Sequence, residues 1–267
     1  MLEQILNRAP LFLLIYARCF TMLLTMPLFS MRSVSRIVKL ALAGYLAFFI
    51  FGSQDFSSYN SYLNGDGAFS IEFILLIIGE GLIGIVLGFY VNIIFGAFST
   101  AGQLTAFQMG FSAASTYDAL AQVENPLLGQ FFNFMAMLIF MQTQWFQKLF
   151  MGGLARSFDS INVFALITGN QTVVTFLLRG LTKLFADALV IALPIMGTLL
   201  LITVCTGLLS KAAPQMNLLS EGFPIMILTA FFIILLITPS LCDFFIRSFN
   251  LGFKALEGLF IEFSGGK

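Results

Sequence analysis

The stretch FSIEFILLIIGEGLIGIVLGFYVNIIFGAF, residues 69–98, decides the fold class, because Glu72 and Glu80 are its only charged side chains. A helix needs about 20 consecutive apolar residues to cross the hydrocarbon core of a bilayer, and this stretch exceeds that length. The composition of the whole chain agrees: 59% of the residues are hydrophobic and 10% are charged, whereas soluble domains have about 45–50% and about 25%. We therefore predict an all-α integral membrane protein.

Further apolar stretches bring the expected number of hydrophobic helical segments to about six. They lie at residues 9–29, 37–51, 127–150, 173–209 and 223–245. At about 1.5 Å of rise per residue, residues 37–51 are too short for about 30 Å of hydrocarbon, and residues 173–209 are much too long. The basic residues do not assign a consistent cytoplasmic side either. These misfits indicate that part of the chain is buried against other subunits instead of lipid.

Small and polar residues recur at every fourth position from residue 80 onward, which places them on one face of a helix. They are Glu80, Gly84, Gly88, Asn92 and Gly96, and a second seam continues through Gly102 and Ala106. A GxxxG pair allows two helix backbones to approach closely, and an acid is costly against lipid. We predict a helix-packing seam; packing within the chain and contact with a neighbouring subunit or a lumen both stay open. Arg18, midway along the first apolar stretch, is a plausible partner for an acid, and the sequence does not say which one.

Residues 99–126 form an unusual segment, because they contain no lysine or arginine and their first half is too apolar for an exposed loop. The segment carries Gln108, Met109 and Phe111 among small residues. Long connections in compact proteins are usually functional or disordered, and Met adapts its shape to irregular spaces. Bulky Met and Phe side chains of this segment are therefore suited to filling a pore. A re-entrant hairpin with a purely structural role is the alternative.

A helical hairpin is expected over the last hundred residues. Residues 211–224, KAAPQMNLLSEGFP, separate the last two long apolar stretches. Proline and glycine favour turns, so we assign the hairpin turn to Pro214, Gln215, Gly222 and Pro224. In the helix before this turn, Lys183 and Asp187 are four residues apart, a spacing that allows an ion pair.

Motifs of catalysis are missing from the sequence. The chain has no histidine, which removes imidazole bases, histidine metal ligands and Ser-His-Asp machinery. It also lacks the GxxxxGK(S/T), GxSxG and HExxH patterns, and its three cysteines are isolated in apolar runs. Scattered basic residues and a formal net charge of +0 leave no footprint for nucleic acid. We expect no enzyme, no metal centre and no nucleic-acid partner.

Four patches of the sequence resemble the FliR family, the flagellar biosynthetic proteins of the type III secretion export gate. The patches are residues 26–30 with the basic turn 32–39, residues 102–111, residues 125–131, and residues 212–217 with 222–224. Together with the hydrophobic pattern they cover nearly the whole chain. The third and fourth patches, in this order and spacing, are the specific ones.

The resemblance implies a function and a set of partners. The chain would be a non-enzymatic subunit of the gate through which unfolded flagellar proteins cross the bacterial inner membrane, at the flagellar basal body. It would assemble with FliP-like, FliQ-like and FlhB-like subunits into a helical multi-subunit gate, and would contact membrane lipid and the unfolded export substrates in transit. No cofactor is implied, since other subunits supply the energy.

The resemblance also implies a division of the chain, with a FliP-like helical part over residues 1–170 and a FliQ-like helical hairpin over residues 171–267. The family's plug loop maps onto residues 108–124. The implied plug and gating residues are Gln108, Met109, Gly110, Phe111, Tyr117 and Asp118. Two alternatives remain: a gate subunit of an injectisome, and a stand-alone secondary transporter or channel with intramembrane polar sites at Glu80, Asn92 and Asp187.

Overall fold

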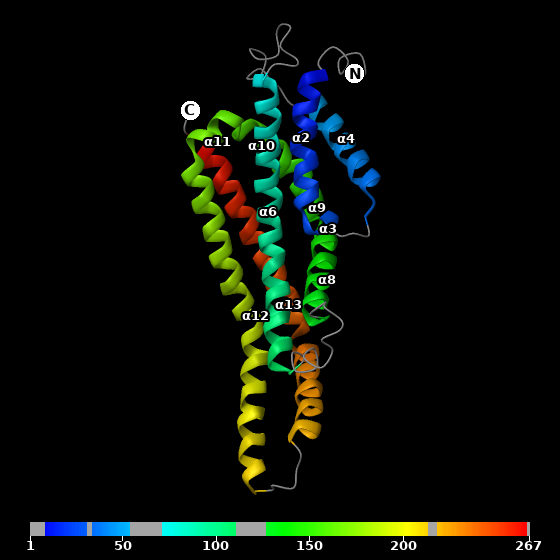
Figure 1. Ribbon diagram of the computed structural model, residues 1–267, viewed down its shortest axis with the longest axis vertical. Helices are drawn as coiled ribbons and strands as arrows, with labels where there is room; N and C mark the ends of the chain where they lie inside the picture. Colours follow the sequence, from blue (N-terminus) through cyan, green and yellow to red (C-terminus); the bar gives the residue numbers. More distant parts are fainter. Residues whose placement is uncertain (1–8, 31–33, 54–70, 111–126, 213–217, 266–267) are drawn as a thin grey trace. The chain divides into compact units, whose positions relative to one another are not determined.

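The computed structural model describes residues 9–30, 34–53, 71–110, 127–212 and 218–265, and its regular structure over these residues is entirely helical (Figure 1). Three helices are long and apolar enough to cross a membrane: α6 (Ile71–Gln108), α12 (Asn170–Ala212) and α13 (Leu218–Ser264). Shorter apolar helices are α2 (Ala9–Thr25) and α8 (Leu127–Gln142). The prediction of an all-α membrane protein is confirmed.

Shorter helices complete the described part of the chain. They are α3 (Pro27–Ser30), α4 (Arg36–Ser53), α9 (Trp145–Gln147), the π-helix η3 (Lys148–Leu154), α10 (Ala155–Ser160) and α11 (Val163–Thr168). The stretch 127–150, expected as one apolar segment, is therefore divided after Gln142. The division falls at Gln144, whose φ of 58° puts this non-glycine residue in the left-handed region and ends the regular helical path.

Two helices are longer than their apolar stretches predict. Helix α6 continues past residue 98 to Gln108, because Ala101, Thr105 and Ala106 are buried and prolong the packed face. Helix α12 runs through Pro194 without interruption. Proline has no backbone N–H, so the helix lacks the hydrogen bond to the carbonyl four residues before Pro194 and still keeps its path.

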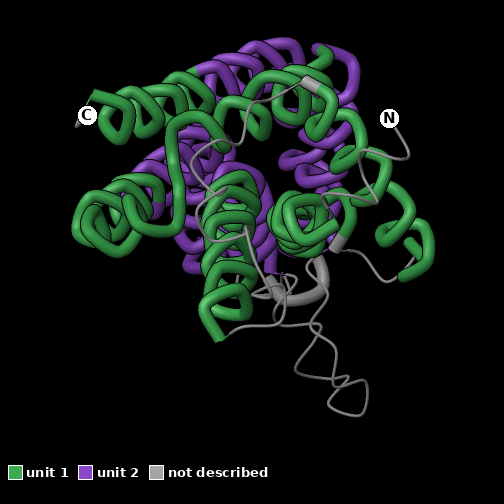
Figure 2. Tube along the Cα trace, turned by 90° about the horizontal axis from the view of Figure 1, so that it is seen from above, with its two compact units in different colours: residues 1–93, 144–180, 251–267 green, residues 94–143, 181–250 purple. Residues whose placement is uncertain are grey.

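Two compact units divide the chain, and both are interleaved along the sequence (Figure 2). Unit 1 comprises residues 1–93, 144–180 and 251–267, and unit 2 comprises residues 94–143 and 181–250. Within unit 1, α2 packs beside α4 (Figure 1), and Leu14, Ile15 and Met22 of α2 are fully buried.

The core of unit 2 is a cluster of five buried phenylalanines from α6, α8 and α13: Phe95, Phe98, Phe140, Phe245 and Phe249. Phe249 lies at the centre, with ring centroids 5.2–5.5 Å from three of the others. Their rings are tilted or edge-to-face, an arrangement that contributes about 0.5–1.5 kcal/mol per pair beyond the burial of area. This cluster binds three sequence-distant helices into one unit.

Threonine hydroxyls within these helices are satisfied by their own backbone. Ten of them donate to the carbonyl four residues earlier: Thr21, Thr25, Thr105, Thr143, Thr168, Thr198, Thr203, Thr206, Thr229 and Thr238. An unsatisfied hydroxyl is costly in an apolar environment. These threonines therefore add polar atoms to the helices without requiring a partner from elsewhere.

Two glycines of the expected seam bring α6 against α2 of the same chain. A Cβ added at Gly84 would overlap the carbonyl oxygen of Arg18, and one added at Gly88 would overlap the hydroxyl of Thr25 and approach the carbonyl of Met22 to 2.6 Å. The absence of a side chain at both positions is what allows the two backbones to touch.

Replacing Gly88 by leucine should therefore push α6 away from α2. Overpacking of a tight contact costs about 1–3 kcal/mol, so we expect the Gly88→Leu protein to melt at a lower temperature in detergent. Gly258→Leu is the matched control in unit 1, because a Cβ there meets no atom within 4 Å. Equal melting temperatures for the two variants would contradict the close approach.

Candidate functional site

Arg18 of α2 and Glu80 of α6 form a buried ion pair in unit 1. The Arg18 Nε donates to Glu80 Oε2 at 2.6 Å, and the two side chains are 0% and 1% exposed. A charge with so little access to water is stable only when it is paired and hydrogen-bonded. The sequence indicated that Arg18 could pair with an acid, and in the structure this acid is Glu80.

The remaining nitrogens of the guanidinium reach a third segment of the chain. Nη1 donates to the Ser157 hydroxyl at 3.0 Å, and Nη2 donates to the Ile161 carbonyl at 2.9 Å. The guanidinium carbon also lies 4.1 Å from the ring centroid of Phe158, within the range of a cation–π contact. We call Arg18, Glu80, Ser157, Phe158 and Ile161 the Arg18 network.

The backbone around residue 161 is shaped to offer a carbonyl to this network. Ile161 is extended, with φ of −122° and ψ of 111°, and it separates α10 from α11. Asn162 then caps α11 by accepting a hydrogen bond from the Ala165 amide at 2.7 Å. Because Ile161 is outside a helix, its carbonyl is available to Arg18.

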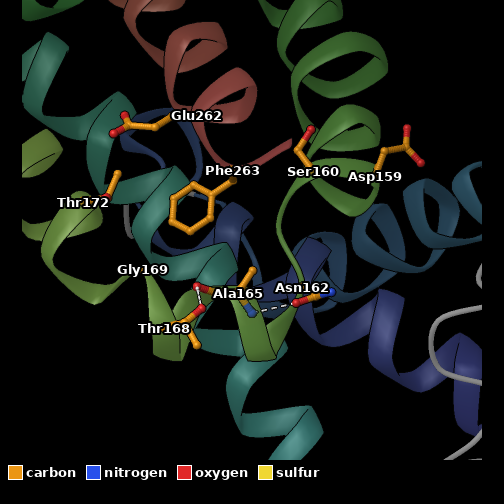
Figure 3. Close-up of a pocket in the computed structure, with 9 residues that line it drawn as sticks. All are labelled: Asp159, Ser160, Asn162, Ala165, Thr168, Gly169, Thr172, Glu262 and Phe263. Carbon is orange, nitrogen blue, oxygen red and sulfur yellow. Dashed lines mark hydrogen bonds between the residues drawn. The ribbon is translucent and has the colours of Figure 1, made fainter. Parts of the chain in front are cut away.

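A polar pocket of about 280 Å³ opens beside this helix–helix junction in unit 1. Figure 3 shows its lining, which comprises Asp159, Ser160, Asn162, Ala165, Thr168, Gly169, Thr172, Glu262 and Phe263. Across the described ranges, no three His, Cys, Asp or Glu side chains come together as a metal site would require. The pocket has two carboxylates and several hydroxyls but no nucleophile paired with a base, so its geometry favours no particular reaction.

The expected plug residues are described only at their beginning. Gln108 is the last residue of α6, Met109 is fully buried, and Gly110 has a φ of +84°. Three others, Phe111, Tyr117 and Asp118, lie outside the described residues.

The expected turn residues are likewise divided. Pro214 and Gln215 lie outside the described residues, whereas Gly222 and Pro224 stand in the first two turns of α13. Helix α13 begins at Leu218, so the break between the two long helices is shorter than the sequence pattern predicts. Proline is tolerated near a helix start, where fewer backbone hydrogen bonds depend on it. A residue of the expected plug also lies beside the expected turn region, because a Cβ added at Gly110 would overlap the ring of Phe223.

The other residues of the expected helix-packing seam differ in burial and in their neighbours. Asn92 is exposed, and Ala106 is buried. In unit 2, a Cβ at Gly96 would lie 2.9 Å from Leu184 Cδ1, and one at Gly102 would lie 2.5 Å from the Cα of Gly129 in α8. The seam residues with close neighbours therefore pack against this chain's own helices.

Sequence reasoning missed several polar partners. Ser157 and Ile161 carry no signal that would pair them with Arg18, because they lie 139 and 143 residues away. The expected ion pair of Lys183 with Asp187 is present in unit 2. Ser248, 61 residues from Asp187, adds a hydrogen bond of 2.6 Å to the same carboxylate.

Comparison with known proteins gives one consistent result. The family described as "Bacterial export proteins, family 1" matches residues 9–252. The flagellar biosynthetic protein FliR of Bacillus subtilis is 28% identical over 97% of this chain and 97% of its own length, and that of Borreliella burgdorferi is 31% identical over 73% and 72%. The surface presentation of antigens protein SpaR of Shigella sonnei is 30% identical over 70% and 72%.

The Arg18 network makes a sharp prediction about stability. Arg18→Met removes the guanidinium that faces the buried Glu80 carboxylate, and breaking one side of a buried pair costs about 3–5 kcal/mol. The double variant Arg18→Met with Glu80→Leu should recover much of this loss, because two apolar side chains replace both charges. Denaturant unfolding of the purified protein measures the difference.

The control for this prediction is Arg156→Ala. Arg156 pairs with Glu257 at 3.8 Å, but the two side chains are 69% and 60% exposed, and such surface pairs contribute little. If Arg18→Met unfolded at the same denaturant concentration as Arg156→Ala, the network would not support the fold.

Proposed function

Because the chain belongs to the bacterial export proteins, family 1, it is a subunit of the type III export gate of the flagellar kind, and we propose that it forms part of the channel without acting as an enzyme. The channel would pass unfolded flagellar proteins across the bacterial inner membrane at the basal body. The observation that carries this proposal is the family match over residues 9–252, joined to whole-length similarity to FliR of Bacillus subtilis.

The surface of the long helices supports assembly in an apolar setting. Leu193 and Leu201 of α12 are more than half exposed, and so are Leu228 and Leu235 of α13. Large exposed apolar surface is typical of contact with a membrane or with other proteins. In an export gate, lipid and neighbouring subunits would cover these exposed apolar side chains.

The partners proposed for this chain are FliP-like, FliQ-like and FlhB-like subunits. We propose that residues 1–170 take a FliP-like place in the gate and residues 171–267 a FliQ-like one. Helix α12 begins at Asn170, and it forms with α13 the two long helices of the second part. These two parts describe proposed positions in the assembly, and their bounds differ from those of the two compact units of the fold.

An injectisome is the second setting that an observation favours. SpaR of Shigella sonnei is 30% identical to this chain over 70% of its length, which is close to the similarity shown by the flagellar relatives. The flagellar setting is preferred because flagellar proteins match over the longer spans, up to 97% of the chain. Both settings place the chain in a protein-export channel.

Assembly tests the proposed function directly. Co-expression with FliP-like and FliQ-like proteins from the same genome should yield one detergent-stable complex in which native mass spectrometry counts each subunit. The exposed apolar side chains of α12 and α13 should be protected in that complex. A folded monomer that ignores these partners, and that alone transports solutes in reconstituted vesicles, would contradict the proposal and favour a stand-alone transporter.

The proposed plug makes a separate prediction. Deleting Gln108–Tyr117 should leave assembly largely intact and should make the assembled gate leak ions, measured as conductance across a planar bilayer. An equal deletion of residues 57–66, between α4 and α6, is the control and should not leak. If removal of Gln108–Tyr117 blocked assembly and gave no leak in the gates that did form, the segment would be structural.

A further inference from the structure

Helix α4 has both of its charged side chains, Arg36 and Lys39, at its start, and residues 40–53 of the helix are uncharged. Ser35 caps this helix, because its hydroxyl accepts a hydrogen bond from the Val38 amide at 3.4 Å and its carbonyl accepts one from the Lys39 amide at 3.3 Å. The amides that precede Val38 have no carbonyl of the helix ahead of them. The start of α4 therefore combines two cations with the positive end of a helix dipole.

Lys39 belongs to the buried face of α4. Ala43, Ala47 and Ile50 follow it at helical spacing and are 0–2% exposed, and the helix that packs beside α4 is α2 (Figure 1). Lys39 itself is 8% exposed. Lysine is almost never buried to this extent unless its charge is paired. A cation thus stands at the end of a stripe that is otherwise apolar and packed.

The ammonium of Lys39 has no partner in the part of the chain that the structure describes, neither in a hydrogen bond nor in an ion pair. Over the same ranges, Asn133 Oδ1 is the only enclosed side-chain nitrogen or oxygen without a partner, so Lys39 Nζ keeps access to the surface. Helical side chains lean toward the N-terminus of their helix, which places this ammonium on the side of the first turn, where Arg36 is exposed. A buried stem with three unused donors at its tip is suited to receive an anion.

The outer side of α4 indicates that this anion belongs to a lipid. Ile37 and Leu40, beside the two cations, are exposed, and so are Tyr45 and Phe49 further along the helix. Large exposed apolar surface is typical of contact with a membrane or with other proteins. Basic side chains at the end of an apolar helix lie at the level of the lipid headgroups, where phosphate groups surround them.

We propose that Arg36, Lys39 and the first amides of α4 bind the phosphate of an anionic phospholipid, whose acyl chains lie along the exposed apolar side of the helix. The phosphate supplies the counter-charge for Lys39, and helix starts bind phosphate through their free amides. A carboxylate of a neighbouring protein would also meet two cations, but a lipid brings the anion and the apolar contact in one molecule. The site lies within unit 1 and does not depend on the proposed export function.

Removal of the Lys39 charge should separate stability from lipid binding. In detergent without lipid, Lys39→Met should raise the melting temperature of the full chain, because methionine keeps an apolar stem and removes an unpaired cation. The same variant should bind phosphatidylglycerol at least about tenfold more weakly, because hydrogen bonds to charged groups are strong. Thermal unfolding measures the first effect, and native mass spectrometry during a lipid titration measures the second.

Three probes identify the source of the phosphate. Phosphatidylglycerol should raise the melting temperature of the unaltered chain by binding to its folded state. Diacylglycerol has acyl chains without phosphate, and inorganic phosphate has no acyl chains, so both should raise it much less. If inorganic phosphate stabilised the chain as much as phosphatidylglycerol does, the lipid assignment would be wrong.

Two further variants serve as controls. Lys254→Met makes the same change of charge at an exposed residue of unit 1, and it should alter neither the melting temperature nor the affinity for phosphatidylglycerol. Lys39→Arg keeps the cation and should keep most of the affinity. Equal losses of affinity in Lys39→Met and Lys254→Met would show only a general attraction of charge and would overturn the site.

A purely structural role for Lys39 gives the opposite signs. In that case Lys39→Met would lower the melting temperature of the lipid-free chain, and its affinity for phosphatidylglycerol would stay unchanged. A protein partner at the same cations is the remaining alternative. It would be shown if the assembled complex retained no phosphatidylglycerol and Lys39→Met lowered the yield of that complex. Either result would overturn the lipid site.

Discussion

One guanidinium that is shut away from water determines how unit 1 is built. Arg18 is 0% exposed, and its hydrogen bonds are shared among the Glu80 carboxylate, the Ser157 hydroxyl and the Ile161 carbonyl. These partners come from two other segments of the chain, Glu80 from α6 and both Ser157 and Ile161 from the α10–α11 junction. A charge in a medium of low polarity is stable only when such partners are all in place. The relative positions of α2, α6 and the α10–α11 junction are therefore interdependent.

The glycine seam and the ion pair are two parts of the same contact. Gly84 stands one turn after Glu80, and the absence of its side chain lets the Arg18 carbonyl lie against α6. A larger residue at Gly84 would separate the helices, and the 2.6 Å bond between Arg18 and Glu80 depends on their closeness. In a membrane the hydrophobic effect does not drive one helix against another, because lipid is equally apolar. The close approach at Gly84 and the ion pair of Arg18 with Glu80 hold α2 and α6 together instead.

Much of this fold is readable from the sequence because membrane helices are dictated by local composition. Apolar runs and the spacing of Lys183 and Asp187 both involve neighbours along the chain. What could not be read depends on packing. The hydrogen bond that Arg18 donates to Ser157 joins residues 139 positions apart, and the close contact between Phe223 and Gly110 follows no local sequence pattern. The left-handed Gln144 also carries no recognisable signal, since glutamine is not typical of that conformation.

The separation of Arg18 from its partners has a consequence for biosynthesis. As the polypeptide leaves the ribosome, Arg18 emerges 62 residues before its counter-ion, 139 residues before the Ser157 hydroxyl and 143 residues before the Ile161 carbonyl that completes its hydrogen bonds. An arginine in the middle of a lone helix is expensive in a bilayer by a few kcal/mol. The set of partners that stabilises this buried guanidinium is therefore complete only once residue 161 has been synthesised.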